Sequence, residues 1–121
     1  MDNKQLLERA AKAAGYEYIK PIDEYDGSLG LELGTNPMRT KSWNPIQSDA
    51  DAFRLMVDCG LTVEITEDDC EAWTIRDDRR LWHSEAFGHH HNDKHAATRM
   101  AIVKAASRNA GKYYRQHEAD T

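Results

Sequence analysis

The chain has 121 residues, enough for one domain with a single hydrophobic core and too few for two. Its 40% hydrophobic and 31% charged residues exclude a disordered chain. No apolar run is long enough to span a membrane, and no apolar signal-peptide core follows the N-terminus, so we expect a protein of the cytoplasm with no membrane partner.

The net charge of −5 is unevenly distributed along the chain. Residues 94–115 contain six Lys or Arg and no acid, whereas the first 93 residues contain 19 acids and 10 bases. Cys59 and Cys70 are too few for a disulfide framework, so we expect reduced thiols, with Cys59 buried as a small apolar residue.

A first helix is predicted over residues 2–15, capped by Asp2 or Asn3 and closed by Gly15. Residues 16–22 are rich in aromatic and β-branched side chains and predict a strand. Leucines alternate at 29, 31 and 33, which predicts a second strand with one buried face, and the two strands are expected to form a hairpin.

Residues 34–47 show no periodicity and predict a long loop, a length that is uncommon unless the loop has a role. Arg39, Lys41 and Trp43 make this loop basic with one large aromatic side chain. Two interpretations are open: Trp43 fills the edge of the core, or the three residues form a phosphate-and-stacking site for a nucleotide.

The next stretch contains start and stop signals for a central helix. Pro45 fixes the chain before it, and Ser48 and Asp51 have capping spacing. Gly60 can take the left-handed conformation that ends a helix. The apolar face of this helix is predicted from helical spacing: Phe53, Met56 and Val57.

A three-stranded meander is predicted next, with Leu61, Val63 and Ile65 on the buried face of its first strand. Its second strand covers residues 71–76, with Trp73 and Ile75 on one face, and its third covers residues 80–87. A last helix should begin at residue 92 or 93, run toward residue 115, and either end early at Gly111 or continue.

The predicted order is therefore αββαβββα, an α+β domain with a mostly antiparallel sheet of about five strands and three helices. The domain covers residues 1–121, with an ordered core at about 3–112 and a polar tail at 116–121. Clean alternation along the strands favours helices on one sheet face only.

Several segments resemble the phage ABA sandwich domain family. They are Trp43-Asn44-Pro45 with Asp49, Asp51 and residues 52–55, the last-helix segment 96–106, and the end of the first helix at 14–16. The resemblance spans roughly residues 4–110 and implies a bacteriophage or prophage protein with an α/β/α sandwich, hence helices on both sheet faces. It carries no catalytic residue, because the family has no established common activity.

Three groups of side chains are candidate sites. Acidic residues at 49–58 and 67–71 could hold a hard cation but match no calcium-loop spacing, and the dipole of the predicted helix explains Asp49 and Asp51 in its first turn. His89, His91 and His95 are weak metal candidates, and a solvated loop is the alternative. The basic side of the last helix is either a solvated face or a docking surface for an acidic or phosphate-bearing partner. Its residues are Lys104, Arg108, Lys112 and Arg115.

No nucleotide-binding, hydrolase or metalloprotease motif is present, so we expect no enzyme and no cofactor. The first hypothesis is a phage protein that binds a host bacterial protein or complex, for example as a counter-defence inhibitor of a CRISPR–Cas complex. The alternatives are sequestration of a nucleotide signal and, with less support from the overall acidity, nucleic-acid binding through the last helix. The oligomeric state is open, and a dimer is one option.

Overall fold

The computed structural model describes residues 2–23, 29–36 and 39–119, with side chains described except at 18–23, 29, 35–36, 39–41, 76 and 110–119. Its helices and strands follow one another in the order α1 (Asn3–Ala13), β1 (Glu17–Asp23), β2 (Leu29–Asn36), β3 (Arg39–Trp43), α2 (Asp49–Asp58), β4 (Thr62–Ile65), β5 (Asp69–Arg76), β6 (Arg79–Ala86), the 3-10 helix η1 (Phe87–His90) and α3 (Lys94–Ala119).

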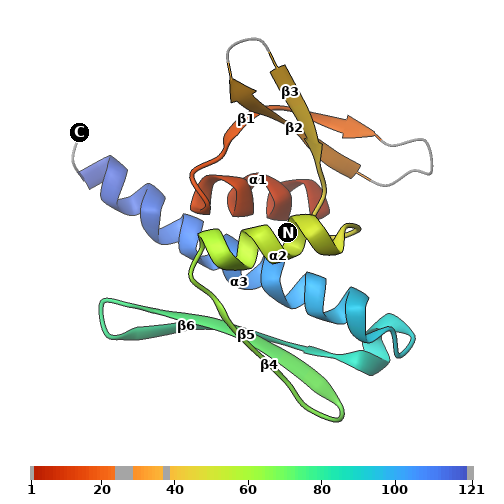
Figure 1. Cartoon of the computed structure of the whole chain (residues 1–121). Coiled ribbons are helices and arrows are strands. Elements are labelled where there is room, and N and C mark those ends of the chain that lie inside the picture. The colour runs from red at the N-terminus through yellow and green to blue at the C-terminus, as the bar shows by residue number, and fades with distance from the viewer. Residues whose placement is uncertain (1, 24–28, 37–38, 120–121) are drawn as a thin grey trace.

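The strands form two antiparallel three-stranded sheets, β1-β2-β3 and β4-β5-β6. Helix α1 packs on β1 and β2, α3 packs on β5 and β6, and the two helices contact each other. The helices therefore form the inner layer between the sheets (Figure 1). The α+β sandwich with three helices is confirmed, and the single predicted sheet is instead divided into two by the helices.

The predicted loop over residues 34–47 contains the additional strand β3. It pairs with β2 in a register that places Trp43 opposite Leu31 and Lys41 opposite Leu33. Strand β3 lies at a sheet edge, and Trp43 is its one described residue that is buried. A strand with so few apolar positions shows no alternation, which explains why the sequence pattern predicts a loop.

Helix α1 begins and ends where its sequence signals predict. The Asp2 carboxylate accepts from the Gln5 backbone N–H at 2.8 Å, and the Gln5 side chain accepts from the Asp2 N–H in return, a capping box. Gly15 has a φ of 79°, the left-handed region that follows a helix end. The predicted stripe is buried at Leu6, Leu7, Ala10 and Ala11.

Helix α3 begins after Asp93, whose carboxylate accepts from the Ala96 N–H at 3.0 Å. The helix continues through Gly111 to Ala119, so neither the early stop nor a separate tail from 116 is observed. It is buried over most of its circumference from residue 101 to 107, because α1, α2 and the sheet of β4–β6 all pack against it. Among the described residues, no helix is both long and apolar enough to cross a bilayer.

The segment before α2 is held by side-chain hydrogen bonds. Trp43 is 3% exposed and meets Tyr16 edge-on, with ring centroids 5.6 Å apart. The Asp51 carboxylate accepts from the Asn44 N–H at 2.9 Å, and the Ser48 hydroxyl accepts from the Asp51 N–H at 3.2 Å. Burial of Trp43 thus fixes the start of α2 on the core.

Helix α2 buries a different stripe from the predicted one. Ala52 and Leu55 are buried, Met56 is half-buried, and Phe53 and Val57 are 61% and 57% exposed. The expected apolar face of Phe53, Met56 and Val57 is therefore wrong as a core face. The apolar sector is wider than the surface that α3 offers, so its Phe53–Val57 side stays exposed.

Candidate functional site

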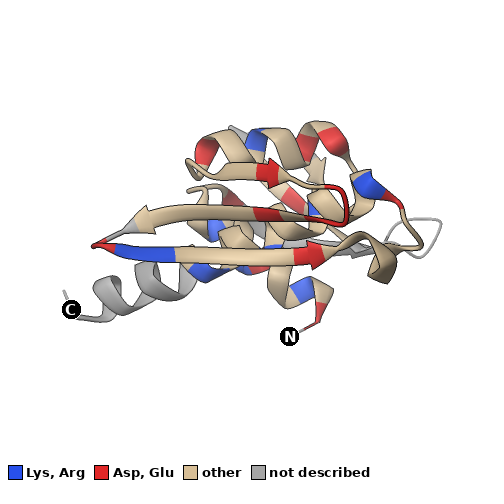
Figure 2. Cartoon of the chain, turned by 90° about the horizontal axis from the view of Figure 1, so that it is seen from below, with Lys and Arg blue, Asp and Glu red and all other residues tan. Residues whose placement is uncertain are grey.

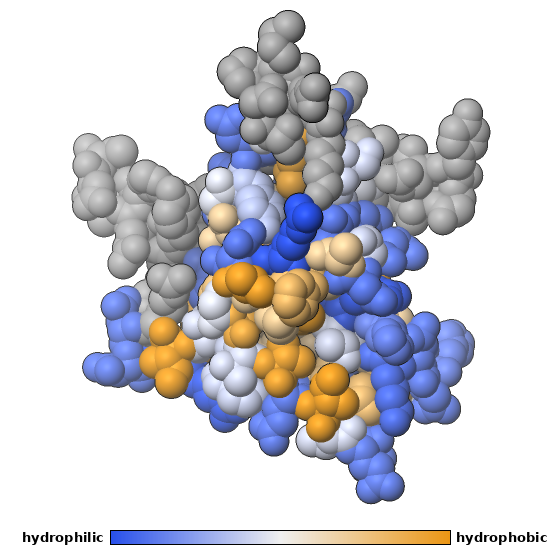
Figure 3. All heavy atoms as spheres, in the orientation of Figure 1, coloured by the Kyte–Doolittle hydropathy of each residue, from blue (hydrophilic) through white to orange (hydrophobic). Residues whose placement is uncertain are grey.

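An apolar groove lies where α2, β4 and α3 meet, with a volume of about 620 Å³. Phe53 and Met56 of α2 form one wall, Val63 and Ile65 of β4 another, and Ile102 of α3 contributes from the third side. Apolar side chains gather on this face of the molecule, over α2 and toward β4 (Figure 3). The remaining lining residues are Asp49, Ala52, Lys94, His95, Thr98 and Arg99.

The strand wall of the groove is incomplete because β4 is the edge strand of its sheet. Val63 and Ile65 share the sheet face that points toward the helices, since side chains alternate along a strand. Ile65, the last residue of this strand, is 59% exposed. The predicted buried face is thus correct at Leu61, which is buried, and at Val63, which packs half-buried against the core, and it is wrong at Ile65.

One end of the groove is fixed by Arg99 of α3. Its Nε donates to the backbone carbonyl of Ile46 at 2.7 Å, and its Nη1 donates to the Asp49 carboxylate at 2.6 Å. The Arg99 hydrogen bond lowers the pKa of Asp49 below its ordinary value. These contacts join the start of α2 to α3, so the relative position of these two walls of the groove is fixed.

The walls formed by α2 and β4 belong to an acidic part of the chain. Residues 49–69 contain seven Asp or Glu and one Arg. Glu64 and the turn residues Glu67 and Asp68 are exposed at the β4 end. Of these acids only Asp49 lines the groove, where it is bound to Arg99, and Glu64 lies on the opposite face of β4 from Val63 and Ile65.

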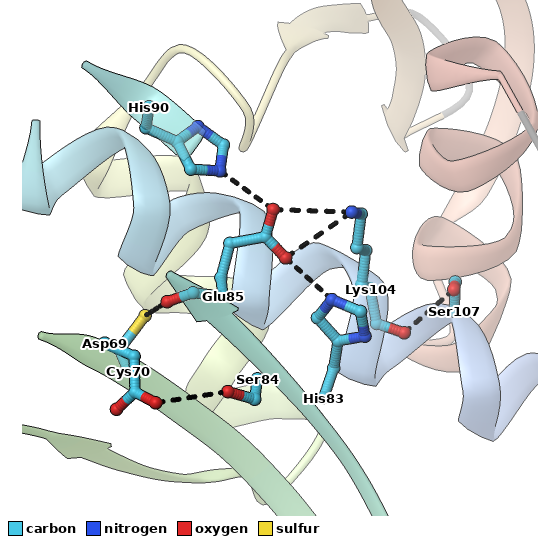
Figure 4. Close-up of polar contacts among 8 residues, drawn as sticks. All are labelled: Asp69, Cys70, His83, Ser84, Glu85, His90, Lys104 and Ser107. Atoms are coloured by element: carbon cyan, nitrogen blue, oxygen red, sulfur yellow. Dashed lines mark hydrogen bonds and ion pairs between the residues drawn. The ribbon is translucent and has the colours of Figure 1, made fainter. Parts of the chain in front are cut away.

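A second cluster surrounds the carboxylate of Glu85, which is 8% exposed (Figure 4). His83 Nε2 lies 2.7 Å from one carboxylate oxygen and His90 Nε2 lies 2.8 Å from the other. Lys104 Nζ donates to both oxygens at 3.4 Å. Glu85 thus joins β6, η1 and α3 through three partners.

Burial raises the pKa of Glu85, but hydrogen bonds from His90 and His83 and the charge of Lys104 outweigh it. The pKa of this carboxyl lies below its ordinary value of 4.5. A buried carboxylate with both oxygens engaged is a structural ion-pair cluster. The described residues contain no group of three or more His, Cys, Asp or Glu side chains arranged to hold a metal ion.

The predicted basic face is divided by this cluster. Lys104 is bound to Glu85 and Arg108 is exposed, so only Arg108 of this pair faces solvent freely. The side chains of Lys112 and Arg115 lie outside the described residues. A docking role for this face stays a prediction.

Trp43, the aromatic residue of the predicted nucleotide site, is not available to bind a base. Trp43 is buried against Tyr16 and has no open face on which a base could stack. The side chains of Arg39 and Lys41 lie outside the described residues.

The histidine candidates do not come together. His91 precedes α3 with a φ of 55°, so it cannot share a helical face with His95. His89 is exposed in η1, and His95 lies 3.6 Å from Asp49. The solvated-loop interpretation fits His89 and His91, whereas His90 is bound to Glu85.

Sequence reasoning misses the groove, although one signal is present. Apolar residues at 52, 53, 55, 56 and 57 make the apolar sector of α2 wider than one packed stripe needs. The packing of α3 and β4 decides which half of this apolar sector stays exposed. The periodicity of the α2 sequence does not predict that packing.

Comparisons of the chain with protein-family models, curated proteins and solved structures found no match. The resemblance to the phage ABA sandwich domain family is therefore a prediction from the sequence motifs alone.

Proposed function

We propose that this chain is a small non-enzymatic phage or prophage protein that binds a host protein in the bacterial cytoplasm. The apolar groove between α2, β4 and α3 is the docking site. The observation that carries the proposal is the exposure of Phe53 and Ile65, which line this groove, at 61% and 59%, with Val57 one helical turn after Phe53 at 57%. Large apolar side chains gathered on one surface mark interaction sites in small proteins.

The charge at the end of β4 indicates the chemistry of the partner. The exposed acids Glu67 and Asp68 follow Ile65 at the end of β4, and they favour a partner segment with basic residues beside its apolar ones. Such a segment places apolar side chains between Phe53 and Ile65 and basic side chains toward the exposed turn residues Glu67 and Asp68. An inhibitor of a host defence complex, such as a CRISPR–Cas complex, would act by this kind of occupation.

The rigid frame of the groove also supports binding. Arg99 joins α3 to Ile46 and Asp49, and Leu55 is fully buried beneath α2. A wall that is already ordered loses little conformational entropy when a partner binds.

The proposal is tested by capture from bacterial lysate with three purified forms of the protein. The wild type is compared with the double variant Phe53→Asp/Ile65→Asp and with Arg108→Asp. The double variant places two charges in the groove, whereas Arg108→Asp alters an exposed residue of α3 outside the residues that line it.

A host protein that is recovered by the wild type and by Arg108→Asp, but not by the double variant, supports docking in the groove. That protein should contain a segment with basic and apolar residues that binds the wild type as a synthetic peptide. If recovery of the host protein depends on Arg108 and not on Phe53 and Ile65, the binding site lies on α3 and not in the groove. Absence of any reproducible partner would contradict the proposal.

A further inference from the structure

The outer face of the sheet β4-β5-β6 is a second unusual surface. Cys70, Ala72 and Glu85 are buried toward the helices, so the alternate residues of these strands face away from the helices. The pairing register places Trp73 opposite Trp82, and Ile75 opposite Arg80. This outer face consists of Thr62, Glu64, Glu71, Trp73, Ile75, Arg80, Trp82 and Ser84.

The centre of the outer face is apolar although it faces solvent. Ile75 is 67% exposed and Trp82 is 44% exposed. The solvated face of an antiparallel sheet normally carries polar residues. The Arg80 guanidinium lies 4.6 Å from the centre of the Trp73 ring, in a cation–π contact. Trp and Arg are the residues that most often dominate the affinity of protein interfaces.

Charge on the outer face is ordered along the strands. Glu64 lies directly opposite Glu71 in the β4–β5 register. Like charges so paired destabilise a sheet. The Trp73–Trp82 pair follows, and Arg80 lies beyond it. In this sheet as a whole, acidic residues adjoin basic ones at the β5–β6 turn and also lie toward the other end of the strands (Figure 2). Arg80 compensates Glu71 only through a long contact of 3.8 Å.

We propose that this outer face binds a second copy of the chain in a two-fold symmetric dimer. A two-fold axis that lies in the interface, perpendicular to the strands and level with the tryptophans, reverses the order of the charges in the second copy. Arg80 of each copy then lies over Ser84 and beside Glu71 of the other, and the tryptophan pairs pack together at the centre. A partner that fits this surface must present acidic, aromatic and basic side chains in the reverse order along the strands. A second copy of the chain does so.

The dimer would leave the groove open in both copies. Val63 and Ile65 line the groove from the opposite face of β4, away from the outer face. Each dimer thus presents two identical grooves, and a host complex with repeated subunits would be bound with higher avidity than by one copy.

A charge-exchange experiment tests the dimer. Mass in solution is measured over a concentration series for the wild type, for Arg80→Glu and for the double variant Glu64→Arg/Glu71→Arg. The wild type should reach twice the chain mass of 13.8 kDa. Each variant alone brings like charges together across the interface and should dissociate at concentrations at least tenfold higher.

The two variants mixed together provide the decisive result. In the mixed pair, residue 80 of each copy lies beside a residue of opposite charge at position 71 of the other, so a mixed dimer should form where neither variant dimerises alone. Phe53→Asp should leave the mass unchanged. A monomeric wild type at all concentrations, or dimers in all variants alike, would overturn the proposal. Far-UV circular dichroism confirms that each variant is folded.

Discussion

At the scale of single residues, neighbouring apolar side chains on α2 have opposite environments. Leu55 is fully buried and Phe53 is 61% exposed, although they are two positions apart. The free energy of a large-to-small substitution depends on how many contacts the removed atoms made. Stability measurements on these two residues therefore test the orientation of α2 and the openness of the groove.

Leu55→Ala should lower the free energy of unfolding by about 2–5 kcal/mol, because it leaves a cavity between α2 and the core. Phe53→Ala should change it by no more than about 0.5 kcal/mol, since the ring is mostly in solvent. Urea denaturation followed by circular dichroism measures both values. Equal losses for the two variants would show that α2 is rotated relative to the structure.

Glu85 gives the chain a predictable response to acid. Its pKa in the folded protein is lowered by His90, His83 and Lys104, so the stabilisation by its ionised form is fully present above about pH 4.5. That stabilisation is lost as the pH falls through the lower folded-state value.

Glu85→Gln should lower the free energy of unfolding by about 1–3 kcal/mol at pH 7, because an uncharged amide cannot replace the ion pair with Lys104 or accept both histidine hydrogen bonds. The difference from the wild type should narrow as the pH is lowered below 4.5. Urea unfolding at a series of pH values measures it. The exposed Glu64→Gln is the control, and a pH-independent difference for Glu85→Gln would argue against the cluster.

At the scale of helices and strands, termini follow local sequence signals and packing faces do not. Gly60 has a φ of 65° after α2, and the Leu61 N–H donates to the Met56 carbonyl at 2.9 Å, which closes the helix. This end, the Ser48 cap and the capping box of Asp2 could all be predicted, because their hydrogen bonds are made within a few residues.

Gly60→Ala should lower the free energy of unfolding by about 1–2 kcal/mol through the strain of a left-handed alanine. Space does not decide the outcome, since no atom lies within 4 Å of an added Cβ at this position. Gly88→Ala is a matched control with the same free space and no positive φ. Thermal and chemical denaturation measure the loss of stability in both variants. Equal losses would show that the left-handed conformation of Gly60 does not cause the effect.

The parts that the sequence did not reveal depend on long-range packing. Strand β3 has only Trp43 to indicate its buried side, and the division of the strands into two sheets depends on α1 and α3 packing between them. The predicted face of Trp73 and Ile75 is correct as a shared face, but it points to solvent, and alternation alone cannot distinguish the two sides. The Glu85 cluster joins residues from β6, η1 and α3 that no short motif connects.

At the scale of the whole molecule, the central point is that burial is incomplete on two separate surfaces. The groove uses the exposed side of α2 and the edge strand β4, and the outer face uses the tryptophans of β5 and β6. Among the described residues, the core between the sheets is buried, and α3 is covered from several sides. A chain that closes its core in this way and leaves these surfaces open is suited to binding other proteins.

Photo-crosslinking in bacteria tests this account most directly. A photoreactive amino acid is placed at residue 53 in the groove or, as a matched control, at residue 108 on the exposed surface of α3. We expect one bacterial protein to be crosslinked reproducibly from position 53 and not from position 108, and the crosslink to disappear when Ile65→Asp is added. Crosslinks of equal yield and identity from both positions, or none from position 53, would contradict the groove as the binding site.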